Sequence, residues 1–178
     1  MQELHLPFEC HTSNYAEDME ARKNPAALAK FLALGKAQYI AHQFSNSIII
    51  GADTFITIKG HKIGKPSTRD EAYQIIESMS GKTINVHSGL AVVKTDSSSK
   101  MIAKEVEHII TTLKIKKMTP ADIRSLAEAE EALQISGAFS IEGEGGKMVE
   151  RIEGDYNNVI GLPLFKLREI LKRMEINF

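Results

Sequence analysis

The chain has 178 residues, of which 43% are hydrophobic and 25% charged, a globular composition that argues against disorder. Its 22 Lys and Arg balance 23 Asp and Glu, so no overall basic field favours a nucleic acid polymer. A single cysteine excludes an intrachain disulfide, and no apolar run approaches the roughly 20 residues of a membrane helix. We expect a cytoplasmic protein that contacts neither a membrane nor a nucleic acid.

The N-terminal half predicts a helix, a buried strand and a hairpin. Asn24–Pro25 is typical of a helix start, and Ala26–Phe44 follows with apolar residues at helical spacing. Ser47–Ala52 predicts a strand buried on both faces, as in parallel or mixed sheets, with Asp53 at its carboxyl end. Phe55–Ile63 has the pattern of a hairpin.

The remainder alternates helices with strands. A capping box at Thr68–Glu71 predicts a helix that Gly81 ends. Two long strands follow, and in the second a change of alternation between Ile110 and Leu113 predicts a bulge or a twist. The later expectations are the strands Thr83–Lys94 and Met101–Lys116, a helix from Thr119 to about Leu133, an irregular Gly137–Arg151, a short strand at Val159–Pro163 and a terminal helix begun by Pro163. We predict one domain over residues 1–178, an α/β fold with two lobes around a central cleft.

Asp53 is the first candidate for chemistry. It follows an apolar strand and two small residues, Gly51 and Ala52, so a ligand can approach the backbone there. An aspartate in such a place can hold Mg²⁺ or orient a water molecule. It can equally cap the turn into the hairpin, and position alone leaves both interpretations open.

Two lysines are candidates for binding phosphate. Lys36 lies on the apolar face of its helix, so it either extends to the edge of the core or points into a cleft, and Gly35 removes bulk beside it. For a lone lysine the first outcome is the commoner. Lys65 precedes Pro66, which favours an extended backbone and presents one cation stiffly.

Two other patterns argue against familiar sites. The glycine-rich Glu142–Lys147 segment is not a Walker A loop, because Met148 stands where a Ser or Thr follows the lysine. We interpret it as a turn with Glu142 at its entrance. The six histidines contain no His-x-x-x-His pair, so a zinc site is not expected.

Several short motifs follow one another along the chain: Ile50–Thr54, Gly64–Pro66, Met79–Lys82, Val86–Gly89, Gly137–Gly143 and Ile152–Pro163. In this order they resemble the Maf family of nucleoside triphosphate pyrophosphatases, whose fold is similar to that of the inosine triphosphatases. The resemblance implies a mixed, twisted sheet with flanking helices. It also implies hydrolysis of a (d)NTP, typically a non-standard one, to the monophosphate and pyrophosphate with Mg²⁺ or Mn²⁺. A cytoplasmic homodimer that clears such nucleotides or restrains septum formation is implied as well.

The resemblance also implies roles for individual residues. Asp53 is similar to the catalytic carboxylate that activates water or holds the metal, and Glu17 to an acidic metal ligand. The implied substrate-binding residues are Lys36, Lys65 and Lys82 for the phosphates, with Thr54 and Glu142 for the base. One metal ion and a few lysines can neutralise a triphosphate without a basic surface. We favour Asp53 positioning the water and the metal over acting as a strong base.

The sequence departs from the family pattern in three places. The family opens with a strand and a Ser-x-x-Arg-Arg loop, but Met1–Leu4 resembles the middle of its first helix. Either the start codon is assigned too late or the protein lacks these phosphate ligands; without that strand, we expect a sheet edge or core to be exposed beside Ile48–Ile50. Glu142 replaces the Gln of many members and cannot donate an amide N–H, which predicts a different base preference. Gln134–Ile135 replaces a charged Asp-Lys pair.

Two other functions compete with hydrolysis. A nucleotide-binding regulator of septum formation that has lost turnover would bind triphosphates without cleaving them. A structural interaction module would leave Lys36, on an apolar helix face, unexplained.

Overall fold

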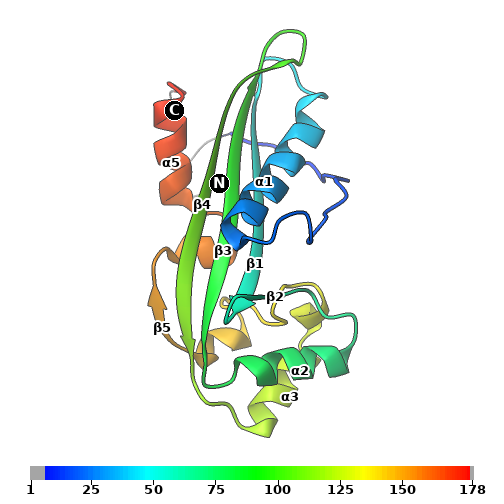
Figure 1. The fold of residues 1–178 in the computed structure, drawn as a ribbon, viewed down its shortest axis with the longest axis vertical. Helices are drawn as coiled ribbons and strands as arrows, with labels where there is room; N and C mark the ends of the chain where they lie inside the picture. The colour runs from blue at the N-terminus through cyan, green and yellow to red at the C-terminus, as the bar shows by residue number, and fades with distance from the viewer. Residues whose placement is uncertain (1–6, 177–178) are drawn as a thin grey trace. The chain divides into compact units, whose positions relative to one another are not determined.

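The computed structural model describes residues 7–176, in which one five-stranded sheet is flanked by helices (Figure 1). The strands are β1 (Ile48–Ile58), β2 (His61–Ile63), β3 (Thr83–Thr95), β4 (Met101–Ile115) and β5 (Val149–Glu153). The α-helices are α1 (Pro25–Ala41), α2 (Arg69–Met79), α3 (Pro120–Glu128), α4 (Tyr156–Ile160) and α5 (Leu164–Arg173). Two 3₁₀ helices, η2 (Glu130–Leu133) and η3 (Glu144–Met148), complete the described elements. The predicted α/β class is confirmed.

The strand order in the sheet is β2-β1-β3-β4-β5. β1 pairs antiparallel with β2 in the register Ile56↔Ile63, and β4 pairs antiparallel with β5. The contacts divide the chain into two compact units. The first unit contains residues up to 53, residues 88–109 and residues from 161 onward. The second contains residues 54–87 and 110–160.

The first unit is a three-layer arrangement whose layers follow from the alternation of side chains along each strand. Ile49 of β1 packs with Ala91 and Val93 of β3 against α1. Their neighbours Ile48 and Ile50, with Leu90 and Val92, pack against α5. Both faces of these strands are therefore covered by a helix, and the continuous apolar run that predicted a doubly buried strand is explained.

The second unit has its own core beneath α2 and α3, which pack against each other. Each helix begins at a threonine. The hydroxyl of Thr119 accepts a bond from the Asp122 N–H, and Asp122 reaches back to the Thr119 N–H, which completes a capping box. Thr68 caps α2 in the same way, but the Glu71 carboxylate accepts from the N–H of Ser67 instead of that of Thr68.

Several element boundaries differ from the sequence expectations. β1 continues through Ile58, so Asp53 lies in the middle of a strand and not at its carboxyl end. The expected strand at Val159–Pro163 is wrong, because Tyr156–Ile160 forms α4. The register shift of β4 against β5 lies at Lys114/Ile115, beyond the predicted position. The expected irregular stretch contains η3 and the first three residues of β5, and the expected helix after Thr119 breaks at Ala129 into α3 and η2.

Two further observations complete the comparison with the sequence. The expectation that Met1–Leu4 resembles part of a helix lies outside the described residues. Among residues 7–176, no helix combines the length and apolar character needed to cross a bilayer.

Candidate active site

The first unit positions its charged residues by an unusually close approach of α1 to the sheet (Figure 1). A Cβ at Gly51 of β1 would lie 2.5 Å from the carbonyl oxygen of Ala33 and 2.8 Å from the amide nitrogen of Ala37. A Cβ at Gly89 of β3 would meet the carbonyl of Ala29. Two glycines on the strands and small residues on the helix therefore let the two backbones touch.

This finding gives Gly51 a packing role that the sequence did not indicate. An added Cβ would meet the backbone of α1, so the missing side chain lets the helix pack on the strand, while Gly51 itself also lines the cavity described below. The helix brings Lys36 within reach of the strand.

The close approach places Lys36 between two carboxylates. Its Nζ lies 2.6 Å from Oδ1 of Asp53 and 2.8 Å from Oε1 of Glu17. The Asp53 side chain is only 8% exposed, whereas those of Lys36 and Glu17 are 25% and 44% exposed. The cluster therefore runs from the buried strand outward to the surface, and Lys36 does not simply extend into solvent.

The two carboxylates keep Lys36 charged. Burial alone would lower the pKa of Lys36, but its hydrogen bonds to Asp53 and Glu17 and the charges of both carboxylates outweigh burial and raise the pKa above its ordinary value. One ammonium and two carboxylates leave a formal charge of −1 on the cluster.

The donor set of this cluster fits a divalent cation of the Mg²⁺ type. Mg²⁺ binds oxygen and is commonly held by one or two protein carboxylates, with substrate phosphates and water as its other ligands. Glu17 and Asp53 supply two such carboxylates around one point, where a cationic group already stands. Among residues 7–176 no group of three or more His, Cys, Asp or Glu forms a metal cage, so a metal here requires phosphate or water ligands.

A cavity of about 1140 Å³ opens beside this cluster within the first unit. Glu17 and Lys36 line it together with Ser47–Ala52 of the β1 edge, and Leu162 and Leu171 add apolar surface. An exposed sheet edge or core was expected beside Ile48–Ile50; instead Ile49 is buried and Ile48 and Ile50 are partly buried, and all three line this cavity. A ligand in this space would meet the ammonium and one carboxylate at its wall.

The other predicted residues belong to the second unit. Thr54 lies on β1 and is partly buried, while Lys65, Lys82 and Glu142 are exposed. The Lys65 loop is anchored at its preceding residue, because the Gly64 carbonyl accepts a 3.2 Å bond from the N–H of Gly137. The structure thus unites Glu17, Lys36 and Asp53, and the roles of the other four residues remain predictions.

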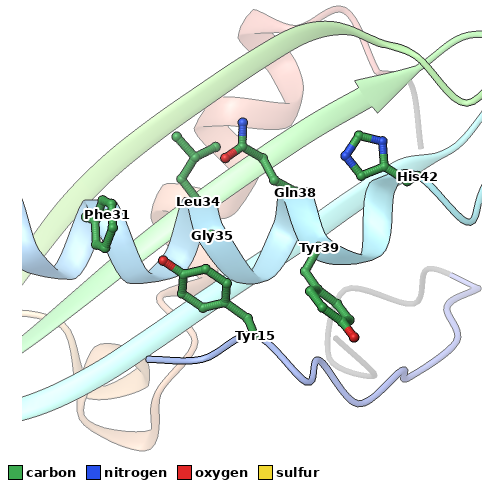
Figure 2. A pocket seen from close by; sticks show the side chains of 7 residues that line it. All are labelled: Tyr15, Phe31, Leu34, Gly35, Gln38, Tyr39 and His42. Atoms are coloured by element: carbon green, nitrogen blue, oxygen red, sulfur yellow. The ribbon is translucent and has the colours of Figure 1, made fainter. Parts of the chain in front are cut away.

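The sequence analysis missed one residue that contacts this site. Figure 2 shows the ring of Tyr15 against α1 at Gly35, beside a cavity of about 630 Å³ that Phe31 and Tyr39 also line. A glycine in the middle of a helix, directly before the candidate lysine, is the pattern that could have revealed the contact.

Comparison with known proteins gives concordant results. Residues 1–174 match the family model described as "Maf-like protein". A dTTP/UTP pyrophosphatase of Methanococcoides burtonii is 38% identical over 170 residues, covering 96% of this chain and 85% of the relative. A dTTP/UTP pyrophosphatase of Alkaliphilus metalliredigens is 36% identical over 179 residues, covering 99% and 91%. One of Bacillus cereus (strain G9842) is 33% identical over 172 residues, covering 97% and 87%.

Proposed function

Because the chain belongs to the Maf-like protein family, we propose that it is a pyrophosphatase that hydrolyses dTTP and UTP to the monophosphate and pyrophosphate. Non-standard pyrimidine triphosphates are further substrates in this proposal. The observation that carries it is the cluster in which the Lys36 ammonium bridges Glu17 and Asp53 at the wall of a large cavity. Three charged residues from a loop, a helix and a strand are brought together there.

In the proposed reaction, water attacks the α-phosphorus, the bond to the bridging oxygen of the β-phosphate breaks, and pyrophosphate leaves. Asp53 orients the attacking water by accepting a hydrogen bond from it. Lys36, which is held cationic by its carboxylate partners, offsets the charge of the phosphate chain. Lys65 and Lys82 contribute further positive charge to phosphate binding, and Thr54 and Glu142 select the base.

Mg²⁺ or Mn²⁺ would supply a Lewis acid that withdraws charge from the phosphate oxygens. Glu17 and Asp53 are the residues that would hold it, since their carboxylates meet at Lys36 and each has a second oxygen besides the one that contacts Nζ. The net negative charge of the cluster supports this assignment, because it attracts a cation even while Lys36 is protonated.

The test is a product assay with purified protein, Mg²⁺ and a panel that contains dTTP, UTP, the other nucleotides and modified pyrimidine triphosphates. Release of pyrophosphate with the monophosphate supports the proposal, whereas release of phosphate with the diphosphate contradicts cleavage at the α–β bond. Asp53→Asn is the matched control, since it keeps the size of the side chain and removes its charge.

Triphosphate binding measured by calorimetry separates hydrolysis from regulation. Saturable binding without any turnover above the Asp53→Asn control would contradict the enzyme and favour the nucleotide-binding regulator. The oligomeric state, which we propose to be a homodimer, is measured on the same sample by light scattering.

A further inference from the structure

The segment that carries Glu17 has neither helix nor strand between residues 7 and 18 and is largely exposed. It runs along α1 and touches the helix region through side-chain rings. The His11 ring lies 4.6 Å from that of Phe44, and the Arg22 guanidinium lies 4.5 Å from the Phe31 ring centre. Between these two contacts, the phenol ring of Tyr15 meets Gly35 (Figure 2).

The Tyr15 contact requires glycine. A Cβ at Gly35 would lie 2.6 Å and 2.7 Å from the two Cε atoms of the Tyr15 ring, so the ring would have to move away from this position on the helix. Gly35 is in the middle of α1, where its backbone is ordinary helix and where alanine would be the better helix former. The glycine is therefore explained by the ring and not by the helix.

The ring contact is next to the ion pair. Tyr15 and Glu17 are two residues apart on the loop, and Gly35 and Lys36 are consecutive on the helix. A partly exposed ion pair such as that of Glu17 with Lys36 is too weak to order a loop by itself. A partly buried ring packed on Gly35, the residue directly before Lys36, can supply this order.

We propose that Tyr15, packed on Gly35, is a positioning residue that holds the Glu17 carboxylate against Lys36. The consequence for catalysis rests on the proposed function, since Glu17 is there a metal ligand. The positioning itself is independent of any substrate or metal.

The first readout is the ammonium of Lys36 in the free protein, observed by NMR of protein labelled with ¹⁵N-lysine. The Glu17→Gln variant gives the signature of a broken pair, namely faster exchange of the Nζ protons with water and a changed ¹⁵Nζ shift. Tyr15→Ala and Gly35→Ala are expected to reproduce that signature. Tyr15→Phe, which keeps the ring, is expected to retain the wild-type signature.

The double variant Tyr15→Ala/Gly35→Ala tests the ring contact most directly. Once Tyr15→Ala has removed the ring, a Cβ at position 35 has room, so Gly35→Ala should add no further change to the Lys36 signature. Tyr39→Ala is the matched control, since Tyr39 is a half-exposed tyrosine that lines the same cavity one turn along α1. Thermal unfolding of every variant confirms that each is folded.

The second readout is the Mg²⁺ concentration that gives half-maximal hydrolysis. Tyr15→Ala is expected to raise it about tenfold, as for loss of a residue that orients a metal ligand, with a smaller change in KM for the nucleotide. The inference is overturned if Tyr15→Ala leaves the Lys36 signature as in wild type, or if the effects of Tyr15→Ala and Gly35→Ala simply add. Absence of hydrolysis in wild-type protein overturns the proposed function and leaves the NMR result to decide the positioning.

Discussion

Nζ of Lys36 donates a 2.6 Å hydrogen bond to Oδ1 of Asp53, a residue 17 positions further along the chain and almost fully buried. The bond joins the middle of α1 to the middle of β1. Removing Lys36 leaves the Asp53 carboxylate, in a poorly solvated place, without this counter-charge, whereas removing Asp53 leaves Lys36 paired with Glu17. The pair is therefore a test of both stability and chemistry.

Lys36→Met is expected to abolish hydrolysis and to lower the free energy of unfolding by roughly 2 kcal/mol, less than for a fully buried pair because Lys36 is a quarter exposed. Urea unfolding and the pyrophosphate assay measure the two effects. Lys30→Met, on an exposed position of the same helix, is the control. An active Lys36→Met protein would exclude Lys36 from phosphate binding.

Gly89→Ala should push α1 away from the sheet, because the new Cβ meets the Ala29 carbonyl and lies 2.9 Å from the Ala33 Cβ. We expect a loss of about 1–3 kcal/mol in the free energy of unfolding, as for overpacking of a core. Gly64→Ala is the control, since a Cβ there meets nothing within 4 Å, and its effect should stay within about 1 kcal/mol. Equal stabilities for the two variants would refute the close approach of helix and sheet.

Lys65→Met is expected to change catalysis without changing stability. Lys65 is exposed, so the free energy of unfolding should not change. If Lys65 binds phosphate, kcat/KM should fall about 10²-fold, the usual effect of removing one group that stabilises the transition-state charge. Lys104→Met, at an exposed position of β4, should leave kcat/KM unaffected. Comparable kinetics for the two variants would remove Lys65 from the site.

Glu142→Gln tests base selection. A carboxylate only accepts hydrogen bonds, whereas the amide of glutamine also donates. The ratio of kcat/KM between pyrimidine triphosphates should change roughly threefold to tenfold, the size of one hydrogen bond. Glu144→Gln, an exposed neighbour that pairs only with Lys147, provides the control. A uniform change for every base would argue against contact between Glu142 and the base.

The stability of the first unit should depend on pH through His108. Burial lowers the pKa of His108, and the positive charge of Lys30 lowers it further. The unfolded chain therefore binds the proton more readily, so the stabilising contribution of neutral His108 is present above about pH 6.5 and is lost as the pH falls through its folded pKa. Urea unfolding at pH 7.5 and pH 5 should show a smaller loss for His108→Gln than for wild type. A pH dependence that is identical in both proteins would contradict the shift.

Local signals in the sequence predicted most of the helices and strands, because their caps and alternation are local. Thr68 and Thr119 begin helices where expected. The error at Val159–Pro163 has a physical cause in a polar residue upstream: the Asp155 carboxylate accepts from the Asn157 N–H and starts α4. The buried Asn158 amide then donates to the Val86 carbonyl, a long-range bond that no local pattern reveals.

The site was predictable only in part, because contacts between residues far apart in the sequence leave no local pattern. The identities of Glu17, Lys36 and Asp53 follow from the family motifs, but their meeting depends on how closely α1 approaches β1. The packing of Gly51 against the backbone of α1 was not predicted, because that neighbour lies far away in the sequence. The ring that covers Gly35 was missed likewise.

Where α1 crosses β1 and β3, the spacing between helix and strands is set by missing side chains at Gly51 and Gly89. Amine and carboxylate are thus attached to two backbones in direct contact, with no flexible packing layer between them to compress or swell. The separation of the two backbones therefore cannot change unless the helix moves as a whole. An evolved change in reactivity at Asp53 is therefore easier to reach through the exposed loop that supplies Glu17 than through the helix itself.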